Sequence, residues 1–208
     1  MMINYVTSSS VKQHEAALDR MFRDRKRVFV DMLKWNVPVD GPYERDQFDD
    51  EYAEYIIMCE PVSGRHLGSL RILRTDRPHI LGDLFHMLCE GEVPTGPEIR
   101  ELTRLCLSPD LRAVDRLKVR NRLFTTAVEY ALLNGIRGYT GVAAMAWYSQ
   151  LLSLGWRCTP LGFPRLVEGA QVAALIAHIE HDTINLFREA GTYNSGDIQI
   201  SYDLRRAA

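Results

Sequence analysis

The spacing of hydrophobic and polar positions predicts helices and strands in the first half of the chain. From residue 13 to 34, hydrophobic side chains recur near helical spacing until Pro38 ends the pattern, which predicts an amphipathic helix that could be broken in two. Residues 55–59 and 67–73 are rich in strand-forming side chains. Turn-forming residues at 61–65 separate these two runs, so we expect an antiparallel hairpin.

In the second half, strands and helices alternate. A third strand is predicted over residues 99–107, before Ser108-Pro109-Asp110, and a helix over 117–133, before Gly135. Residues 138–143 are typical of a buried strand, 146–154 of a helix, and the remainder of further strands with a helix near 183–189. We therefore predict an α/β fold, a three-layer α-β-α sandwich around a mixed twisted sheet.

Composition narrows the classes of protein to which the chain can belong. A hydrophobic content of 46% is sufficient for a core in one domain over residues 1–208, since no repeat or linker divides the sequence. The net charge of -2 favours neither nucleic acid nor a membrane surface. No secretion signal or membrane-spanning run is present, and the four separated cysteines indicate free thiols, so we expect a cytoplasmic protein.

The first half of the chain contains a set of motifs that is more specific than the composition. The order of elements resembles the GNAT acyltransferase fold, although residues 111–117 lack the Gly-rich pyrophosphate loop usual in acetyl-coenzyme A enzymes. Five pieces then occur in order: Arg25-x3-Phe29-x5-Trp35, the acidic run with Glu44, Asp46 and Asp49, Gly68-Ser69-Leu70-Arg71, Phe85, and Glu101-Leu102-Thr103-Arg104. Together they resemble the signature of the acyl-homoserine-lactone synthase family.

The resemblance implies N-acylation of S-adenosylmethionine by an acyl thioester, then lactonisation with release of methylthioadenosine. S-adenosylmethionine would be a substrate, and no cofactor or metal is implied. Asp46 and Asp49 could complement its positive charges, and Arg25 or Arg104 could hold its carboxylate. Phe29 and Trp35 offer aromatic faces to the adenine or the sulfonium. Arg71 could instead pair with Asp46 or Asp49.

Glu101 occupies the family position of a general base, with Arg71 and Arg104 in the same catalytic group. A base is useful because an α-amino group has a pKa of about 8 and is mostly protonated at neutral pH. The alternative is a purely structural ion pair of Glu101 with Arg104 or Arg71. His178 and His181 lack a third ligand with recognisable spacing, so we predict no metal site.

The family's acyl chain lies between the sheet and the later helices. The acyl-binding candidates are Phe85, Leu105, Phe124, Val142, Ala143, Met145, Trp147 and Leu151. Serine or threonine near residues 142–144 accompanies 3-oxo chains in the family, so Ala143 and Ala144 favour unsubstituted chains. The donor could be acyl carrier protein or acyl-coenzyme A. Two other hypotheses are a GNAT-like N-acyltransferase for another amine and a non-catalytic module that binds acyl ligands.

Overall fold

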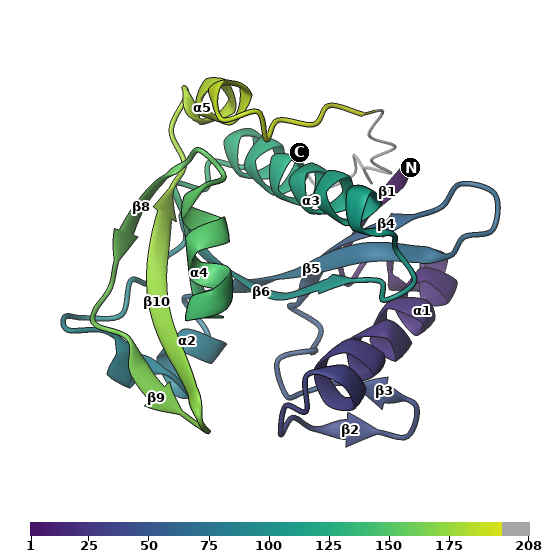
Figure 1. Ribbon diagram of the computed structural model, residues 1–208, viewed down its shortest axis with the longest axis horizontal. Helices are drawn as coiled ribbons and strands as arrows, with labels where there is room; N and C mark the ends of the chain where they lie inside the picture. Colours follow the sequence, from purple (N-terminus) through teal and green to yellow (C-terminus); the bar gives the residue numbers. More distant parts are fainter. Residues whose placement is uncertain (197–208) are drawn as a thin grey trace.

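The computed structural model describes residues 1–196, which form a mixed sheet with helices on both faces (Figure 1). The strand order is β1-β4-β5-β6-β7-β10-β8, and β9 pairs with β10. The strands are β1 (Met2–Val6), β4 (Glu54–Cys59), β5 (His66–Arg74), β6 (Ile99–Leu107), β7 (Gly138–Ala144), β8 (Arg157–Pro160), β9 (Arg165–Val167) and β10 (Ala170–His178). A separate hairpin joins β2 (Val39–Asp40) to β3 (Tyr43–Glu44).

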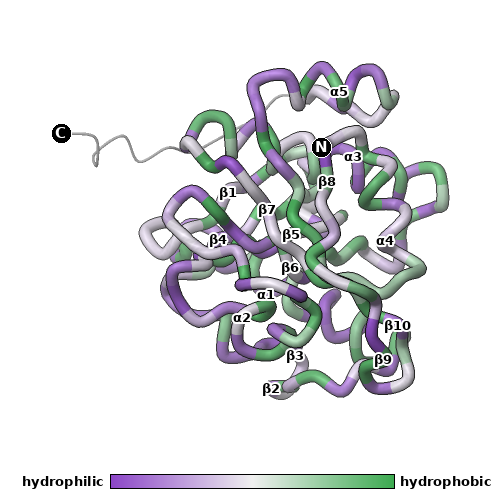
Figure 2. The backbone as a smooth tube through the Cα atoms, turned by 90° about the vertical axis from the view of Figure 1, so that its left-hand side faces the viewer, coloured by the Kyte–Doolittle hydropathy of each residue, from purple (hydrophilic) through white to green (hydrophobic). Residues whose placement is uncertain are grey.

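The main helices lie on opposite faces of the sheet. These helices are α1 (Glu15–Arg25), α2 (Ile80–Asp83), α3 (Ala113–Leu133), α4 (Met145–Leu152) and α5 (Thr183–Glu189). Figure 1 shows α3 above the sheet and α1 below it, with α5 beside α3. The larger hydrophobic core lies beneath α3 and a second core beneath α1. Along α5, hydrophobic and hydrophilic positions alternate, as expected for a helix with one face in the core (Figure 2). The predicted three-layer fold is confirmed.

Most predicted elements are present, with two corrections. The helix predicted over 13–34 divides in two, as the prediction allowed, because α1 continues into a π-helix over Lys26–Met32. The helix predicted from residue 117 begins at Ala113. The sequence reading missed β1, so the order of elements begins with a strand and not with a helix. This short strand lies at the edge of the sheet, where pairing with β4 stabilises it more than its own pattern indicates.

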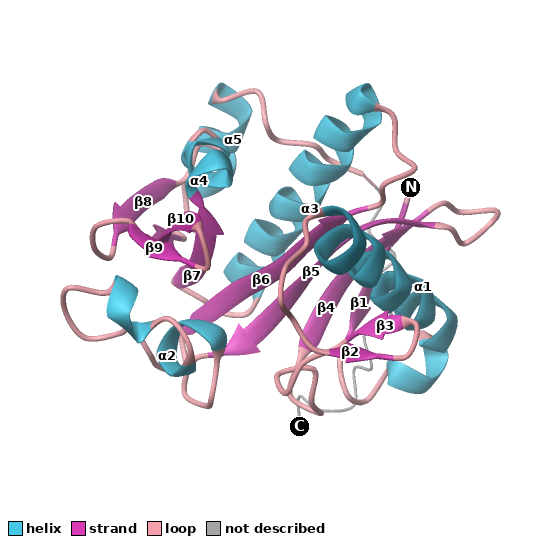
Figure 3. Ribbon diagram, turned by 60° about the horizontal axis from the view of Figure 1, so that its bottom comes forward, coloured by secondary structure: helices cyan, strands magenta, loops and turns pink. Residues whose placement is uncertain are grey.

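Two irregularities in β6 position the site. β6 pairs in parallel with β7 only from Ile99–Gly138 to Glu101–Thr140, after which the two strands separate (Figure 3). The pairing of β5 with β6 shifts register between Ser69 and Arg71. No helix within residues 1–196 is both long and apolar enough to cross a membrane.

Candidate active site

Three arginines and three carboxylates form one closed network between α1 and the sheet. We call it the arginine–carboxylate ring. It consists of Arg25, at the end of α1, Glu44 on β3, Asp46 and Asp49 in the following loop, Arg71 on β5 and Arg104 on β6. Opposite charges in equal number can satisfy one another here without solvent.

Arg25 is the most deeply buried member of the ring. Its side chain is fully buried, and its Nε donates to Glu44 at 2.6 Å. Its two terminal nitrogens donate to the two oxygens of Asp49 at 2.8 and 2.9 Å. Tyr55 also donates its hydroxyl to Asp49. The Arg25 guanidinium is thus fully engaged within the protein, and it has no free side for a substrate carboxylate.

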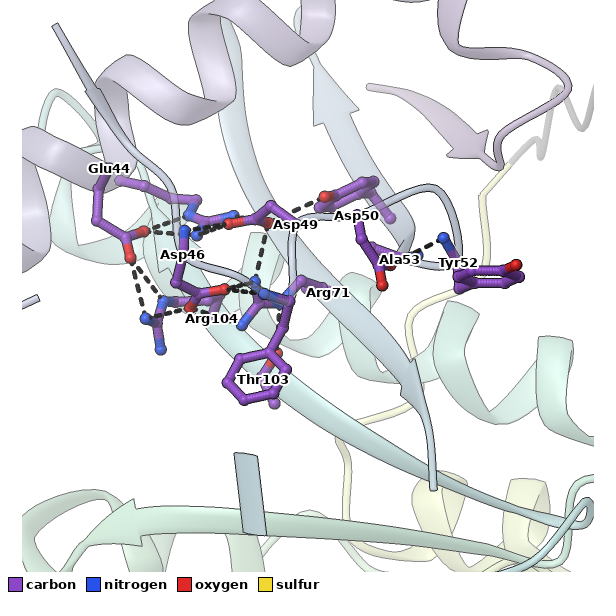
Figure 4. Close-up of polar contacts among 12 residues, drawn as sticks. Glu44, Asp46, Asp49, Asp50, Tyr52, Ala53, Arg71, Thr103 and Arg104 are labelled. Atoms are coloured by element: carbon purple, nitrogen blue, oxygen red, sulfur yellow. Dashed lines mark hydrogen bonds and ion pairs between the residues drawn. The ribbon is translucent and has the colours of Figure 1, made fainter. Parts of the chain in front are cut away.

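Arg71 and Arg104 complete the ring from the sheet (Figure 4). Arg71 donates to both oxygens of Asp46, at 2.6 and 3.0 Å, and lies 2.9 Å from Asp49. Arg104 donates to Glu44 at 3.0 Å and to Asp46 at 2.6 Å. The predicted alternative, in which Arg71 pairs with the aspartates, describes this geometry.

Charge pairing in the ring outweighs the cost of burial. Burial alone would raise the pKa of Asp49, but Arg25 and Arg71 hold it well below its ordinary value. Burial likewise opposes the charge of Arg25, yet Asp49 and Glu44 keep the pKa of Arg25 above its ordinary value. Asp49 and Arg25 therefore stay charged, and loss of one member of the ring would leave a buried charge without its partner.

Arg104 connects the ring to an aromatic pair. Its φ of +51° is in the left-handed region, and the register shift of β6 at this point accommodates it. Its guanidinium lies 5.8 Å from the centre of the Phe29 ring. Phe29 stacks on Trp35, with ring centres 4.9 Å apart. Phe29 is buried, whereas 45% of Trp35 is exposed, so Trp35 presents aromatic surface beside the ring.

Glu101 lies on the same strand but outside the ring. It is the last residue of β6 that pairs with β7, and it is completely buried. Its Oε1 accepts the backbone N–H of Leu81 at 2.9 Å, but its Oε2 has no hydrogen-bond partner within residues 1–196. Burial raises the pKa of Glu101 to about 7, against the opposing effect of the Leu81 and Ile80 amides and of two nearby arginines. Such a carboxyl can accept a proton near neutral pH.

The acyl-binding candidates divide between the two faces of the sheet. One group packs in the core beneath α3, and the other packs around Leu81 on the α2 side. Met145 is exposed and Trp147 is partly exposed on α4. The first group is Leu105, Phe124, Ala143 and Leu151, and the second is Phe85 and Val142.

Sequence reasoning left two features of the site unassigned. Glu44 was grouped with the acidic run but given no partner, and it bridges Arg25 and Arg104. The backbone amide of Leu81 could not be identified from the sequence, because no residue type marks a backbone donor. Among residues 1–196, no group of three or more His, Cys, Asp and Glu side chains is arranged to hold a metal ion. His178 instead contacts the Thr159 hydroxyl at 2.8 Å.

Known proteins resemble this chain along most of its length. The sequence profile of the autoinducer synthase family matches residues 9–187. An acyl-homoserine-lactone synthase of Rhizobium etli is 31% identical over 166 residues, which are 79% of this chain and 78% of that protein. The isovaleryl-homoserine lactone synthase of Bradyrhizobium diazoefficiens is 27% identical over 191 residues, which are 90% and 84% of the two chains.

Solved structures agree with the sequence comparisons. A CoA-dependent acyl-homoserine lactone synthase, BjaI, solved with SAM and isopentyl-CoA, gives a TM-score of 0.85 at 27% identity, over 96% of this chain and 92% of that one. An N-acetyltransferase of Lactobacillus plantarum shares the fold alone, with a TM-score of 0.57 at 16% identity, over 86% of this chain and 100% of that one. The chain therefore belongs to the autoinducer synthase family and is an acyltransferase of the acyl-homoserine-lactone synthase type.

Proposed function

We propose that Glu101 is the general base with which this synthase acylates S-adenosylmethionine. The observation that carries the proposal is the free Oε2 of a fully buried carboxyl, at the point where β6 and β7 separate. A buried carboxylate oxygen without a partner has a high cost, which a structural ion pair would have avoided. The alternative pairing of Glu101 with Arg71 or Arg104 is not formed, because within residues 1–196 the carboxylates paired with these two arginines belong to the ring.

The first step forms the amide bond. Glu101 accepts a proton from the α-ammonium group of S-adenosylmethionine, directly or through water, and the neutral amine attacks the thioester carbonyl. The tetrahedral intermediate collapses, the C–S bond breaks, and the thiol leaves with a proton. A base with a pKa of about 7 and an amine with a pKa of about 8 are well matched for this transfer.

The second step closes the lactone. The carboxylate of the acylated substrate attacks its own γ-carbon, and methylthioadenosine leaves with the electrons of the C–S bond. This step requires a folded-back conformation and no further cofactor. Trp35 offers its exposed face to the adenine or the sulfonium, and Arg104, 12% exposed, is the ring arginine that can reach a substrate carboxylate. We assign Arg25 and Arg71 to holding this site in place.

We propose an unsubstituted acyl-coenzyme A as the donor. The likeness to two CoA-dependent synthases supports it, since BjaI and MesI give TM-scores of 0.85 and 0.82. Ala143, which pairs with Ala173 on β10, carries no hydroxyl that could bind a 3-oxo group. An acyl carrier protein is the competing donor.

Mass spectrometry of the purified protein with S-adenosylmethionine and matched panels of acyl-CoA and acyl-carrier-protein thioesters tests the proposal. We expect N-acyl-homoserine lactone and methylthioadenosine in equal amounts from acyl-CoA, and loss of both with Glu101→Gln. Preference for the carrier-protein thioester would overturn the donor assignment. An acylated amine without methylthioadenosine would indicate a general acyltransferase, and acyl binding without turnover a regulatory module.

Ala143→Thr tests the assignment of the acyl chain. The added hydroxyl should shift the ratio of kcat/KM for 3-oxo over unsubstituted donors upward by about tenfold, the effect of one hydrogen bond in a buried site. Ala170→Thr, at an exposed position of β10, serves as the control. An unchanged ratio in the Ala143 variant would contradict the assignment.

A further inference from the structure

The segment that donates to Glu101 is itself held by an unusual contact. His79 precedes α2 and is buried, with only 4% of its surface exposed. Its Nδ1 lies 2.8 Å from the carbonyl oxygen of Arg77, which can only accept, so Nδ1 carries the hydrogen. The imidazole ring lies directly against Gly82, where a Cβ would come within 2.6 Å of Cε1 and 3.0 Å of Nε2. Gly82 therefore allows the ring to lie on the turn.

This contact fixes the turn that faces Glu101. The N–H of Asp83 donates to the backbone carbonyl of His79, so both the ring and the backbone of His79 contact α2. Leu81 is completely buried in the cluster with Leu88 and Ala174. Its N–H donates to Glu101 Oε1 at 2.9 Å. The position of this amide thus depends on the packing of His79 against Gly82.

We propose that the His79–Gly82 contact is a positioning device for the base, which aims the α2 amide at Oε1 of Glu101 and leaves Oε2 for the substrate ammonium group. The proposal rests on the proposed role of Glu101. His79 and Gly82 act through Leu81 and are positioning residues, with no contact to the reacting atoms assigned to them. Without the amide, either oxygen of Glu101 could turn toward the interior, and the carboxylate would lose a hydrogen bond that favours its charged form.

Several charged groups act on Glu101 besides this amide. Arg71 on β5 and Arg104 on β6 both favour its ionised form, and the Ile80 amide adds to the effect of Leu81. From β7 the facing residue is Thr140, which does not titrate. His79 is the titratable group on the α2 side, and Asp83 on α2 is exposed. A displaced turn would remove the amides while the two arginines remain.

The test is the pH profile of kcat/KM for the Gly82→Ala variant with S-adenosylmethionine and the acyl donor. The added methyl collides with the His79 ring and displaces the turn. We expect the acid limb of the profile to move up by about one pH unit, because the carboxylate loses one hydrogen bond that favours its charged form. Turnover at pH 7 should therefore fall about fivefold. KM for S-adenosylmethionine should change less than about twofold.

Two further variants separate positioning from general damage. His79→Ala removes the same contact from the other side and should move the acid limb in the same direction, and the double variant with Gly82→Ala should move it no further, whereas independent structural damage would add. Gly91→Ala is the matched control, because nothing lies within 4 Å of its Cβ position. An unshifted profile for Gly82→Ala, with Glu101→Gln inactive, would overturn the positioning proposal alone. Full activity of Glu101→Gln would instead overturn the base assignment on which it rests.

Discussion

The arginine–carboxylate ring and Glu101 meet on strand β6, which carries Arg104 of the ring as well as Glu101. The two differ in how their charges are satisfied. Each carboxylate of the ring is paired with arginine, as Arg104 is with Glu44 and Asp46. Glu101, three positions earlier on the strand, has one backbone hydrogen bond and one oxygen without a partner. Both are buried, so the difference lies in the partners and not in the solvent.

The contrast separates two uses of a buried carboxylate. In the ring, arginines keep the pKa of Asp49 low, so its charge does not change near neutral pH and it can serve as a fixed support. At Glu101, burial dominates and raises the pKa to about 7, so the charge can change during a reaction. A support needs constant charge, whereas a base needs variable charge.

Breaking the ring should have the largest effect on stability. Asp49→Ala leaves Arg25 and Arg71 facing less negative charge in a buried site, and we expect the free energy of unfolding to fall by roughly 3–5 kcal/mol. Urea denaturation measures this loss. Asp31→Ala removes an exposed partner of Lys26 and should cost less than about 1 kcal/mol. Equal losses in the two variants would refute the structural role of the ring.

Removing the charge of Glu101 should lower turnover much more than it weakens substrate binding. Glu101→Gln retains the shape and the acceptor for Leu81 but cannot take a proton, so kcat should fall at least roughly 100-fold. KM for S-adenosylmethionine should change only a few-fold, as measured by steady-state kinetics. The exposed Glu98→Gln serves as the control and should leave both constants unchanged. A kcat near that of the wild type would eliminate Glu101 as the base.

Glu101→Gln, which should lower turnover, should raise the stability of the fold above pH 7. Because the pKa of Glu101 is about 7 in the folded protein against 4.5 ordinarily, the unfolded chain releases a proton that the folded chain retains. Glu101 therefore lowers stability as pH rises from 4.5 to 7, and Glu101→Gln should exceed the wild type by roughly 3 kcal/mol at pH 8. Urea denaturation should show little difference at pH 4.5. A gap independent of pH would contradict the raised pKa.

The smallest effect is expected at the aromatic pair beside the ring. Trp35→Ala removes the ring that stacks on Phe29 and, with it, the exposed aromatic face, so KM for S-adenosylmethionine should rise about tenfold, with kcat little changed. Trp35→Phe retains an aromatic surface and should recover most of the affinity. Isothermal titration with S-adenosylmethionine measures both variants. Unchanged affinity in Trp35→Ala would place the adenosyl group elsewhere.

The sequence predicted the fold well but only part of the site. Helical and strand periodicities predicted α3, the β4–β5 hairpin and β6, because these elements bury a regular face. The charged signature residues other than Glu101 lie together in the ring. Which carboxylate pairs with which arginine could not be predicted, because six charges from four segments have many possible pairings and only tertiary packing selects one.

Two other features could not be predicted from sequence patterns. Arg104 has a left-handed backbone although it is not glycine, and no local motif marks the register shift that permits it. The hydrogen bond to Glu101 comes from a backbone amide, which every residue except proline possesses. Its direction depends on how α2 packs in the fold.

The register shift in β6 also bears on how the chain avoids misfolding. Side chains alternate between the two faces of a strand, so a slip of one residue between β5 and β6 would turn Arg104 toward the core beneath α3. Glu44 and Asp46 would then lose a cation, and an arginine would enter an apolar layer. The ring thus disfavours a misaligned pairing of β5 with β6, so the charges that support the site also help to select the correct register of the sheet.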